Sequence, residues 1–133
     1  MNPDLIPVKT DLWKKRWLDI CQVNENMGIK TIIIVQPILG TGNKTLSLDE
    51  SFMVAKLIEH KVPFEILNSF SNELPNLEQR CEKTMDLQNI YDNIKEPLYF
   101  DMVHVSDKGN EIVANKIYDE ILPIVIEDIE NSP

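Results

Sequence analysis

Residues 31–36 read Thr31-Ile32-Ile33-Ile34-Val35-Gln36, and this run decides the fold class. It is β-branched and apolar, and it shows no alternation of apolar and polar side chains. A strand of this kind is buried on both faces, as in a parallel sheet that lies between two layers of helices. Pro37 ends the run, and the loop over residues 38–46 follows. The run therefore predicts an α/β protein.

The segments beside this strand are typical of helices. Residues 10–27 have helical spacing, with Thr10 as the expected N-cap. The expected stripe on one side of this helix consists of Trp13, Trp17, Ile20, Cys21 and Asn24. Ser47 and Glu50 have the spacing of a capping box, which predicts a helix as far as residue 60. We expect the inward face of that helix to consist of Leu48, Phe52, Ala55 and Ile58.

The second half of the chain is less regular. Residues 62–67 suggest a short strand, at a sheet edge because of Pro63. A helix is expected from about Pro75, since Leu77, Cys81 and Met85 have helical spacing. A last helix is expected over residues 107–125, capped by Ser106, with a buried face of Val113, Ala114, Ile117, Tyr118 and Ile121.

These elements predict an α/β layered domain over residues 1–133 with about two strands. Two strands are too few for a sheet covered by helices on both faces. We therefore expect the chain to form part of a larger assembly. The exposed sheet edge would be covered by a partner or by a second copy of the chain.

The composition excludes several classes of protein. The chain has 13 basic and 22 acidic residues and a formal net charge of -9, so nucleic-acid binding is not expected. No apolar run reaches about 18 residues, so no transmembrane segment is expected. No signal peptide is visible, which makes a cytoplasmic location the default expectation. The two cysteines, Cys21 and Cys81, are expected to be buried free thiols.

The strongest chemical motif is Asp101-Met102-Val103-His104, which directly precedes the last helix. At this spacing, one loop can turn the Asp101 carboxylate onto Nδ1 of His104. Such a contact fixes the tautomer, leaves Nε2 free as a base and stabilises the imidazolium. The alternative without a function is a surface loop in which His104 has no role. Neither a cofactor nor a metal is expected, because no third ligand has a fixed spacing to this pair.

Asp101-x-x-His104 and the Val-Ser-Asp-Lys-Gly-Asn that follows resemble the last conserved block of the SGNH/GDSL hydrolases. Residues 31–37 resemble a late core strand of that family, and residues 86–92 resemble the approach to its Asp-x-x-His loop. The resemblance implies a three-layer α/β/α flavodoxin-like fold and hydrolysis of an ester through a serine acyl-enzyme. It also implies that His104 is the general base and that Asp101 orients it.

The chain departs from this family in one large respect. It contains no Gly-Asp-Ser nucleophile block, and the residues that complete the oxyanion hole are also missing. The sequence is therefore similar to the C-terminal half of such a hydrolase. The resemblance implies that a missing N-terminal half is the partner at the sheet edge, and we expect the chain alone to be inactive. The alternatives are a non-catalytic binding module on the same fold and an unrelated small α/β domain.

Overall fold

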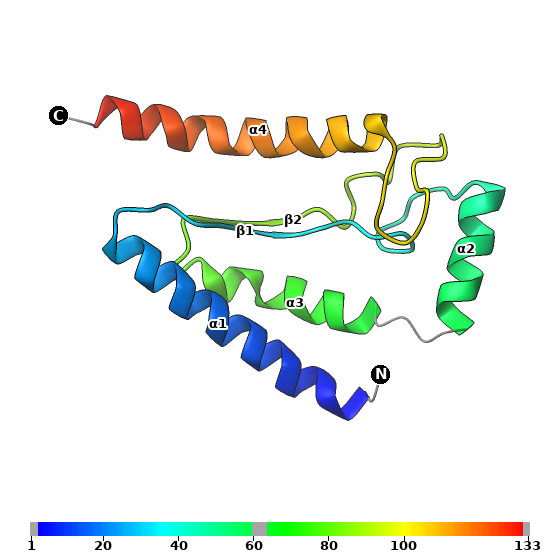
Figure 1. Cartoon of the computed structure of the whole chain (residues 1–133), viewed down its shortest axis with the longest axis horizontal. Coiled ribbons are helices and arrows are strands. Elements are labelled where there is room, and N and C mark those ends of the chain that lie inside the picture. Colours follow the sequence, from blue (N-terminus) through cyan, green and yellow to red (C-terminus); the bar gives the residue numbers. More distant parts are fainter. Residues whose placement is uncertain (1–2, 60–63, 132–133) are drawn as a thin grey trace.

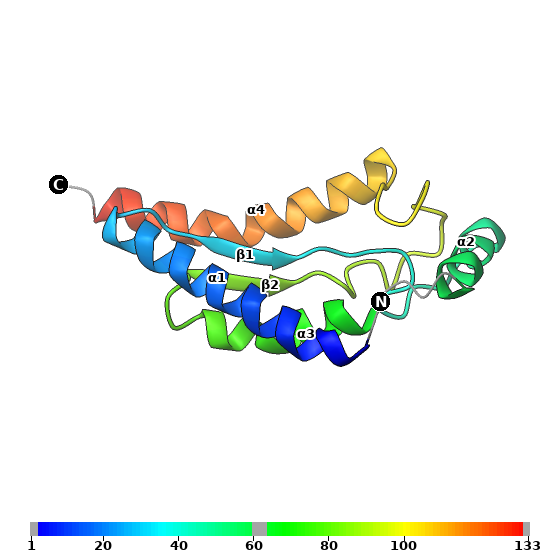
Figure 2. The same ribbon diagram turned by 60° about the horizontal axis from the view of Figure 1, so that its bottom comes forward.

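The computed structural model describes residues 3–59 and 64–131, and these form a mixed α/β structure that is mostly helical. A 3₁₀ turn, η1 (Pro3–Leu5), leads directly into the first helix. Figure 1 shows α4 on one side of two strands and α1 and α3 on the other, and Figure 2 shows the strands side by side. The elements are α1 (Ile6–Asn26), β1 (Ile32–Val35), α2 (Leu48–Glu59), α3 (Phe64–Leu77), β2 (Lys83–Asp86) and α4 (Asp107–Glu130).

The described part of the chain has one sheet, in which β1 and β2 pair in parallel. Ile32 lies opposite Lys83, and Val35 lies opposite Asp86. The expected strand within residues 31–36 is confirmed, but only one of its faces is fully buried: Ile33 and Val35 are buried, whereas Ile32 and Ile34 are half-buried. In contrast, β2 has the polar sequence Lys-Thr-Met-Asp and shows no strand pattern of its own. It is extended because its backbone completes the hydrogen bonds of β1.

The main core lies between the sheet and the α1–α3 layer. Trp13 of α1 stacks on Phe70 of α3, with ring centroids 4.6 Å apart. Ile33 and Val35 project from β1 into the same cluster. A second cluster, around Leu39, Tyr91, Leu98 and Tyr99, lies near the last loop and packs against α2 and the start of α4. Burial of the apolar side chains in these two clusters is the main source of the stability of the fold.

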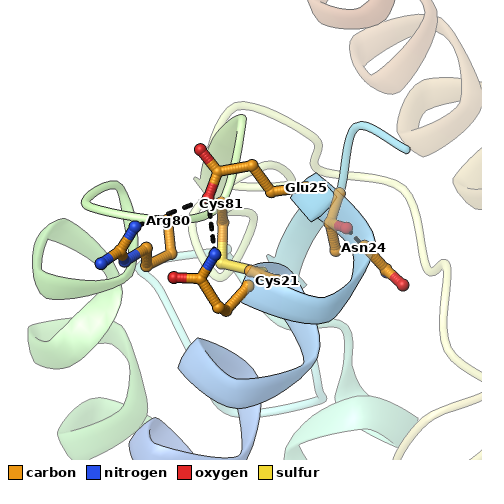
Figure 3. Close-up of a disulfide and its surroundings, with 7 residues drawn as sticks. Cys21, Asn24, Glu25, Arg80 and Cys81 are labelled. Atoms are coloured by element: carbon orange, nitrogen blue, oxygen red, sulfur yellow. Dashed lines mark hydrogen bonds and ion pairs between the residues drawn. A yellow bond between two sulfur atoms is a disulfide. The ribbon is translucent and has the colours of Figure 1, made fainter. Parts of the chain in front are cut away.

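The two cysteines form a disulfide, so the expectation of free thiols is wrong. Cys21 lies near the end of α1, and Cys81 lies in the turn between α3 and β2 (Figure 3). Both are buried, with a Cα–Cα distance of 5.0 Å. An ion pair between Arg80 and Glu25 lies beside the bond. The sequence could not reveal this pairing because the two residues are 60 positions apart.

Two expected elements between residues 62 and 85 are wrong. Residues 64–67 belong to α3 instead of a strand, and residues 62–63, including Pro63, lie outside the described residues. The helix expected from Pro75 is also absent, since α3 ends at Leu77 and Met85 lies in β2. The buried residues Ile66, Leu74 and Leu77 have helical spacing, and they pack α3 under the sheet.

The expected inward face of α2 is also wrong. Leu48, Phe52, Ala55 and Ile58 are exposed, and the opposite face, with Met53, Val54 and Leu57, packs against the second cluster. The capping box is confirmed: Ser47 Oγ accepts from the Glu50 N–H, and Glu50 Oε2 accepts from the Ser47 N–H. Apolar side chains occur on both faces of α2, so periodicity alone could not select the buried one.

The two long helices differ from expectation mainly at their ends. Thr10 is not the cap of α1, because the helix begins at Ile6 and the Thr10 hydroxyl donates to the Ile6 carbonyl. On the expected stripe of this helix, Cys21 is buried but Ile20 is exposed. In α4, Ser106 is the N-cap as expected, whereas Ala114 and Tyr118, which were expected on its buried face, are exposed.

None of the helices in the described ranges is long and apolar enough to span a membrane.

Candidate functional site

The Asp101–His104 motif lies on a narrow loop that leaves and re-enters the protein at adjacent points. Tyr99 and Val105 form an antiparallel bridge. The Phe100 N–H donates to the His104 carbonyl at 2.9 Å, and the Ser106 N–H donates to the Leu98 carbonyl at 2.8 Å. These bonds close the base of the loop, so that residues 101–104 form its tip. The tip is therefore held by backbone bonds.

Within the tip, Asp101 makes three hydrogen bonds. Its Oδ1 accepts from the backbone N–H groups of Val103 and His104, both at 2.8 Å. Its Oδ2 lies 2.7 Å from Nδ1 of His104. A carboxylate can only accept, so Nδ1 carries the proton and Nε2 of the neutral ring is left as an acceptor. The spacing predicted this Asp–His contact, and the contact is present.

The charge of Asp101 is well stabilised. The N–H groups of His104 and Val103, followed by the His104 side chain, lower the pKa of Asp101 from 3.8 to about 2. Asp101 therefore stays ionised at neutral pH. The His104 side chain is 76% exposed, so its ring is open to solvent and to a reacting group. The pair has the geometry of a base and its orienting carboxylate.

Glu50 anchors the base of the loop, a role that the sequence did not reveal. Its side chain is fully buried, and Oε1 accepts from the N–H groups of Leu98 and Tyr99 at 2.9 and 3.2 Å. Its Oε2 pairs with the buried Lys44 ammonium at 2.9 Å. Although burial opposes ionisation, these donors together lower the pKa of Glu50 from 4.5 to about 2. A buried anion with four donors thus joins α2 to the loop.

Gly109 allows the loop to lie close to α4. A Cβ atom at this position would lie 2.7 Å from Cβ of Val105, which is too close for a side chain. The Gly109 carbonyl accepts from the Tyr91 hydroxyl at 3.0 Å, and Tyr91 meets Tyr99 edge to face. Close packing at Gly109 therefore requires the absence of a side chain. It fixes the position of Val105, directly after His104.

The loop lies just beyond the carboxyl end of β1. The Leu39 N–H, four residues after the end of β1, donates to the Met102 carbonyl at 2.8 Å. Ligands of open α/β sheets bind beyond the carboxyl ends of the strands. The pair therefore lies at the end of the sheet where chemistry is expected in this fold class.

A polar hollow of about 220 Å³ lies at the carboxyl end of β2, and the sequence did not point to it. Gln88 lines it and is buried; its Nε2 donates to the Ser71 hydroxyl at 2.6 Å. The Gln88 Oε1 is a buried atom without a hydrogen-bond partner in the described residues. The Nε2 of the same amide also lies 3.4 Å from Asp86 Oδ2. The other lining residues are Gly42, Asn68, Asn72, Asp86 and Asn89.

The structure supplies no nucleophile beside His104. Across residues 3–59 and 64–131, no hydroxyl or thiol is hydrogen-bonded to the His104 ring. Ser47 and Ser106 are helix caps, as expected. Ser69 and Ser71 bond to Thr10 and Gln88, and both thiols are in the disulfide. Ser51 lies exposed on α2, whereas Ser132 lies outside the described residues. Within the described residues, the only side-chain group that is hydrogen-bonded to the His104 ring is therefore the Asp101 carboxylate.

Within the described ranges, no group of three His, Cys, Asp or Glu side chains lies close enough together to hold a metal ion. Comparisons with protein-family models, with curated proteins and with solved structures find no match for this chain. The site must therefore be interpreted from its own geometry.

Proposed function

We propose that this chain is the Asp-x-x-His half of an SGNH/GDSL-type ester hydrolase with a partial three-layer flavodoxin-like fold. In this proposal, Asp101 orients His104, and Nε2 of His104 takes the proton from a serine hydroxyl and returns it to the leaving alcohol. The serine comes from outside this chain, so the chain alone is inactive. The substrate is an ester of unspecified type.

The contact between Asp101 Oδ2 and His104 Nδ1 carries this proposal. Three further features support it. The ring is exposed, the loop lies beyond the carboxyl end of β1, and the base of the loop is fixed by a buried carboxylate. A chance Asp-x-x-His on a surface loop would not need this degree of support from neighbouring elements.

The test is complementation. The reading frame next to that of this chain is sequenced for a Gly-Asp-Ser block, and the two products are co-expressed and assayed with short-chain nitrophenyl esters. We expect hydrolysis only when both products are present. His104→Ala should abolish it, and Asp101→Asn should lower kcat by about 10⁴-fold. Lys108→Ala, four residues beyond His104, is the matched control. A frame without Gly-Asp-Ser, or a joint product that hydrolyses no ester, would refute the proposal.

A non-catalytic binding module is the second candidate. The observation that favours it is the absence of a nucleophile near His104 in the described residues. Under this alternative, this chain and the product of the neighbouring reading frame form a complex when they are co-expressed. His104→Ala then changes neither the stability nor the composition of that complex.

A further inference from the structure

One edge of the sheet is open and has none of the usual features that block strand addition. Thr31 and Val35 accept hydrogen bonds from the β2 side, so their carbonyls face β2. Backbone direction alternates along a strand, and the backbone groups of Ile32 and Ile34 therefore point out of the opposite edge. Proteins commonly protect such an edge with proline, charge or a bulge. The sequence Ile-Ile-Ile-Val of β1 contains neither proline nor charge.

On one side of the sheet, α4 carries an exposed apolar stripe that extends past this edge. The stripe consists of Tyr118, Leu122, Val125 and Ile129. Its direction follows from two ion pairs: Glu120 pairs with Lys83 of β2, and Asp128 pairs with Lys30 just before β1. Successive residues are about 100° apart around a helix, so Asp128, which marks the side towards β1, lies about 80° from Glu120, which marks the side towards β2. The apolar stripe lies about 60–120° beyond Asp128 in the same direction. The stripe of α4 thus lies beyond β1.

On the other side, α1 carries a matching exposed stripe of Leu12, Ile20 and Val23, and the exposed Met27 directly follows the helix. The opposite side of α1 faces α3, through contacts of Thr10 with Ser69 and of Lys14 with Glu73. Asn24, which bonds to Thr31, marks the direction of β1. Around the axis of α1, Asn24 lies between the side that faces α3 and the exposed stripe. The stripe therefore points past β1 and away from α3. Both layers therefore present apolar side chains around the same open edge.

Within the described residues, no strand other than β2 pairs with β1. α3 packs against both strands, and α1 packs mainly against α3. Trp13 and Trp17 of α1 also pack against the cluster that contains Ile33 and Val35, so α1 lies beside α3 on the same face of β1. Figures 1 and 2 show α4 on the opposite side of the strands.

We propose that the free edge of β1 is an acceptor for a β-strand of another polypeptide, and that this strand is apolar on both faces. Main-chain bonds to Ile32 and Ile34 provide the attachment. The stripes of α1 and α4 require apolar side chains on alternate residues of both faces. The acceptor role rests on this packing alone, whereas a serine on the incoming polypeptide rests on the proposed function.

A second copy of this chain does not fit the same edge through its own β1. A two-fold axis between two β1 strands would lie about 2.4 Å from each of them. Because α1 packs on the face of β1, rotation about that axis would leave the two copies of α1 closer together than the roughly 8–10 Å that packed helices need. The occupant is therefore a strand of a different polypeptide.

The test uses the whole chain and a fluorescein-labelled peptide that contains residues 30–36 flanked by lysines, as a strand that is apolar on both faces. Binding is measured by fluorescence anisotropy. Ile34→Pro removes the N–H that points out of the edge and leaves the bonds between β1 and β2 intact. Val23→Lys places a charge on the stripe of α1. Ile58→Lys, at an exposed site on α2, is the matched control.

We expect saturable binding to the unmodified chain and to Ile58→Lys, with affinity at least about tenfold lower for Ile34→Pro and for Val23→Lys. No binding, or equal binding to all variants, would overturn the inference. So would sedimentation that shows a dimer which Ile34→Pro converts to a monomer, because the occupant would then be a second copy. Peptide binding without ester hydrolysis in the complementation assay would refute the proposed function and leave the acceptor edge standing.

Discussion

Asp101 is held in its ionised form mainly by backbone groups, and this has a measurable consequence. Its pKa falls from 3.8 to about 2, so the stabilisation is present above pH 3.8 and is lost as the pH falls through about 2. In His104→Ala, both N–H donors to Oδ1 remain. We predict that the NMR titration midpoint of Asp101 stays below 3.8 in this variant. A midpoint at 3.8 would mean that the imidazole, and not the backbone, supplies the effect.

Gly109 is the second residue whose identity is dictated by a single contact. In Gly109→Ala, the new methyl group would meet Cβ of Val105 at 2.7 Å, so the loop or the start of α4 must move. We predict a loss of about 1–3 kcal/mol of unfolding free energy, measured by urea denaturation. Asn115→Ala, at an exposed position of the same helix, should change little. Equal effects at the two sites would show that Val105 is not tightly packed.

The sequence predicted the contact between Asp101 and His104 because both residues lie in one four-residue segment. It did not predict the role of Glu50, whose partners Leu98 and Tyr99 are 48 and 49 positions away. The capping box explained Glu50 fully at the local level, so nothing in the sequence pointed to a second task. The cysteine pair was missed for the same reason, since its members come together only through the packing of α1 and α3.

At the scale of elements, the attachment of α2 to the loop depends on a buried ion pair. Glu50→Ala would leave the Lys44 ammonium without its partner and two backbone N–H groups unsatisfied. We predict a loss of about 3–5 kcal/mol in unfolding free energy, measured by chemical denaturation at pH 7. The exposed Glu111→Ala is the control.

The same pair gives a pH dependence. The pKa of Glu50 is lowered from 4.5 to about 2, so its contribution is complete above pH 4.5 and declines as the pH falls towards 2. The difference in stability between the unmodified chain and Glu50→Ala should narrow over that range. A constant difference from pH 7 to pH 2 would contradict the assigned pKa.

Elements were predicted from sequence where their pattern was local and unambiguous. The continuous apolar run of β1 and the capped start of α4 met this condition. The short run at residues 62–67 is compatible with either a strand or a helix, and only the later apolar residues Phe70, Leu74 and Leu77 favour α3. β2 depends on its neighbour, because its side chains carry no strand signal.

At the scale of the whole molecule, the disulfide joins the two ends of a long segment. The separation of 60 residues between Cys21 and Cys81 predicts a contribution of about 4 kcal/mol through the reduced entropy of the unfolded chain. We predict that reduction lowers the unfolding free energy by about this amount, as measured by urea denaturation with and without dithiothreitol. Mass spectrometry of the unreduced protein should find no free thiol. Two thiols that alkylate in the folded, unreduced protein would contradict the bond.

The same bond encloses β1, α2 and α3 in one covalent ring, which the chain enters near the end of α1 and leaves just before β2. A protease that cuts once inside the ring, for example in the glycine-containing loop at residues 40–42, cannot release either piece. The nicked protein would migrate as a single band until a reductant is added and as two bands afterwards. Scission within this segment would therefore escape detection wherever thiols stay oxidised.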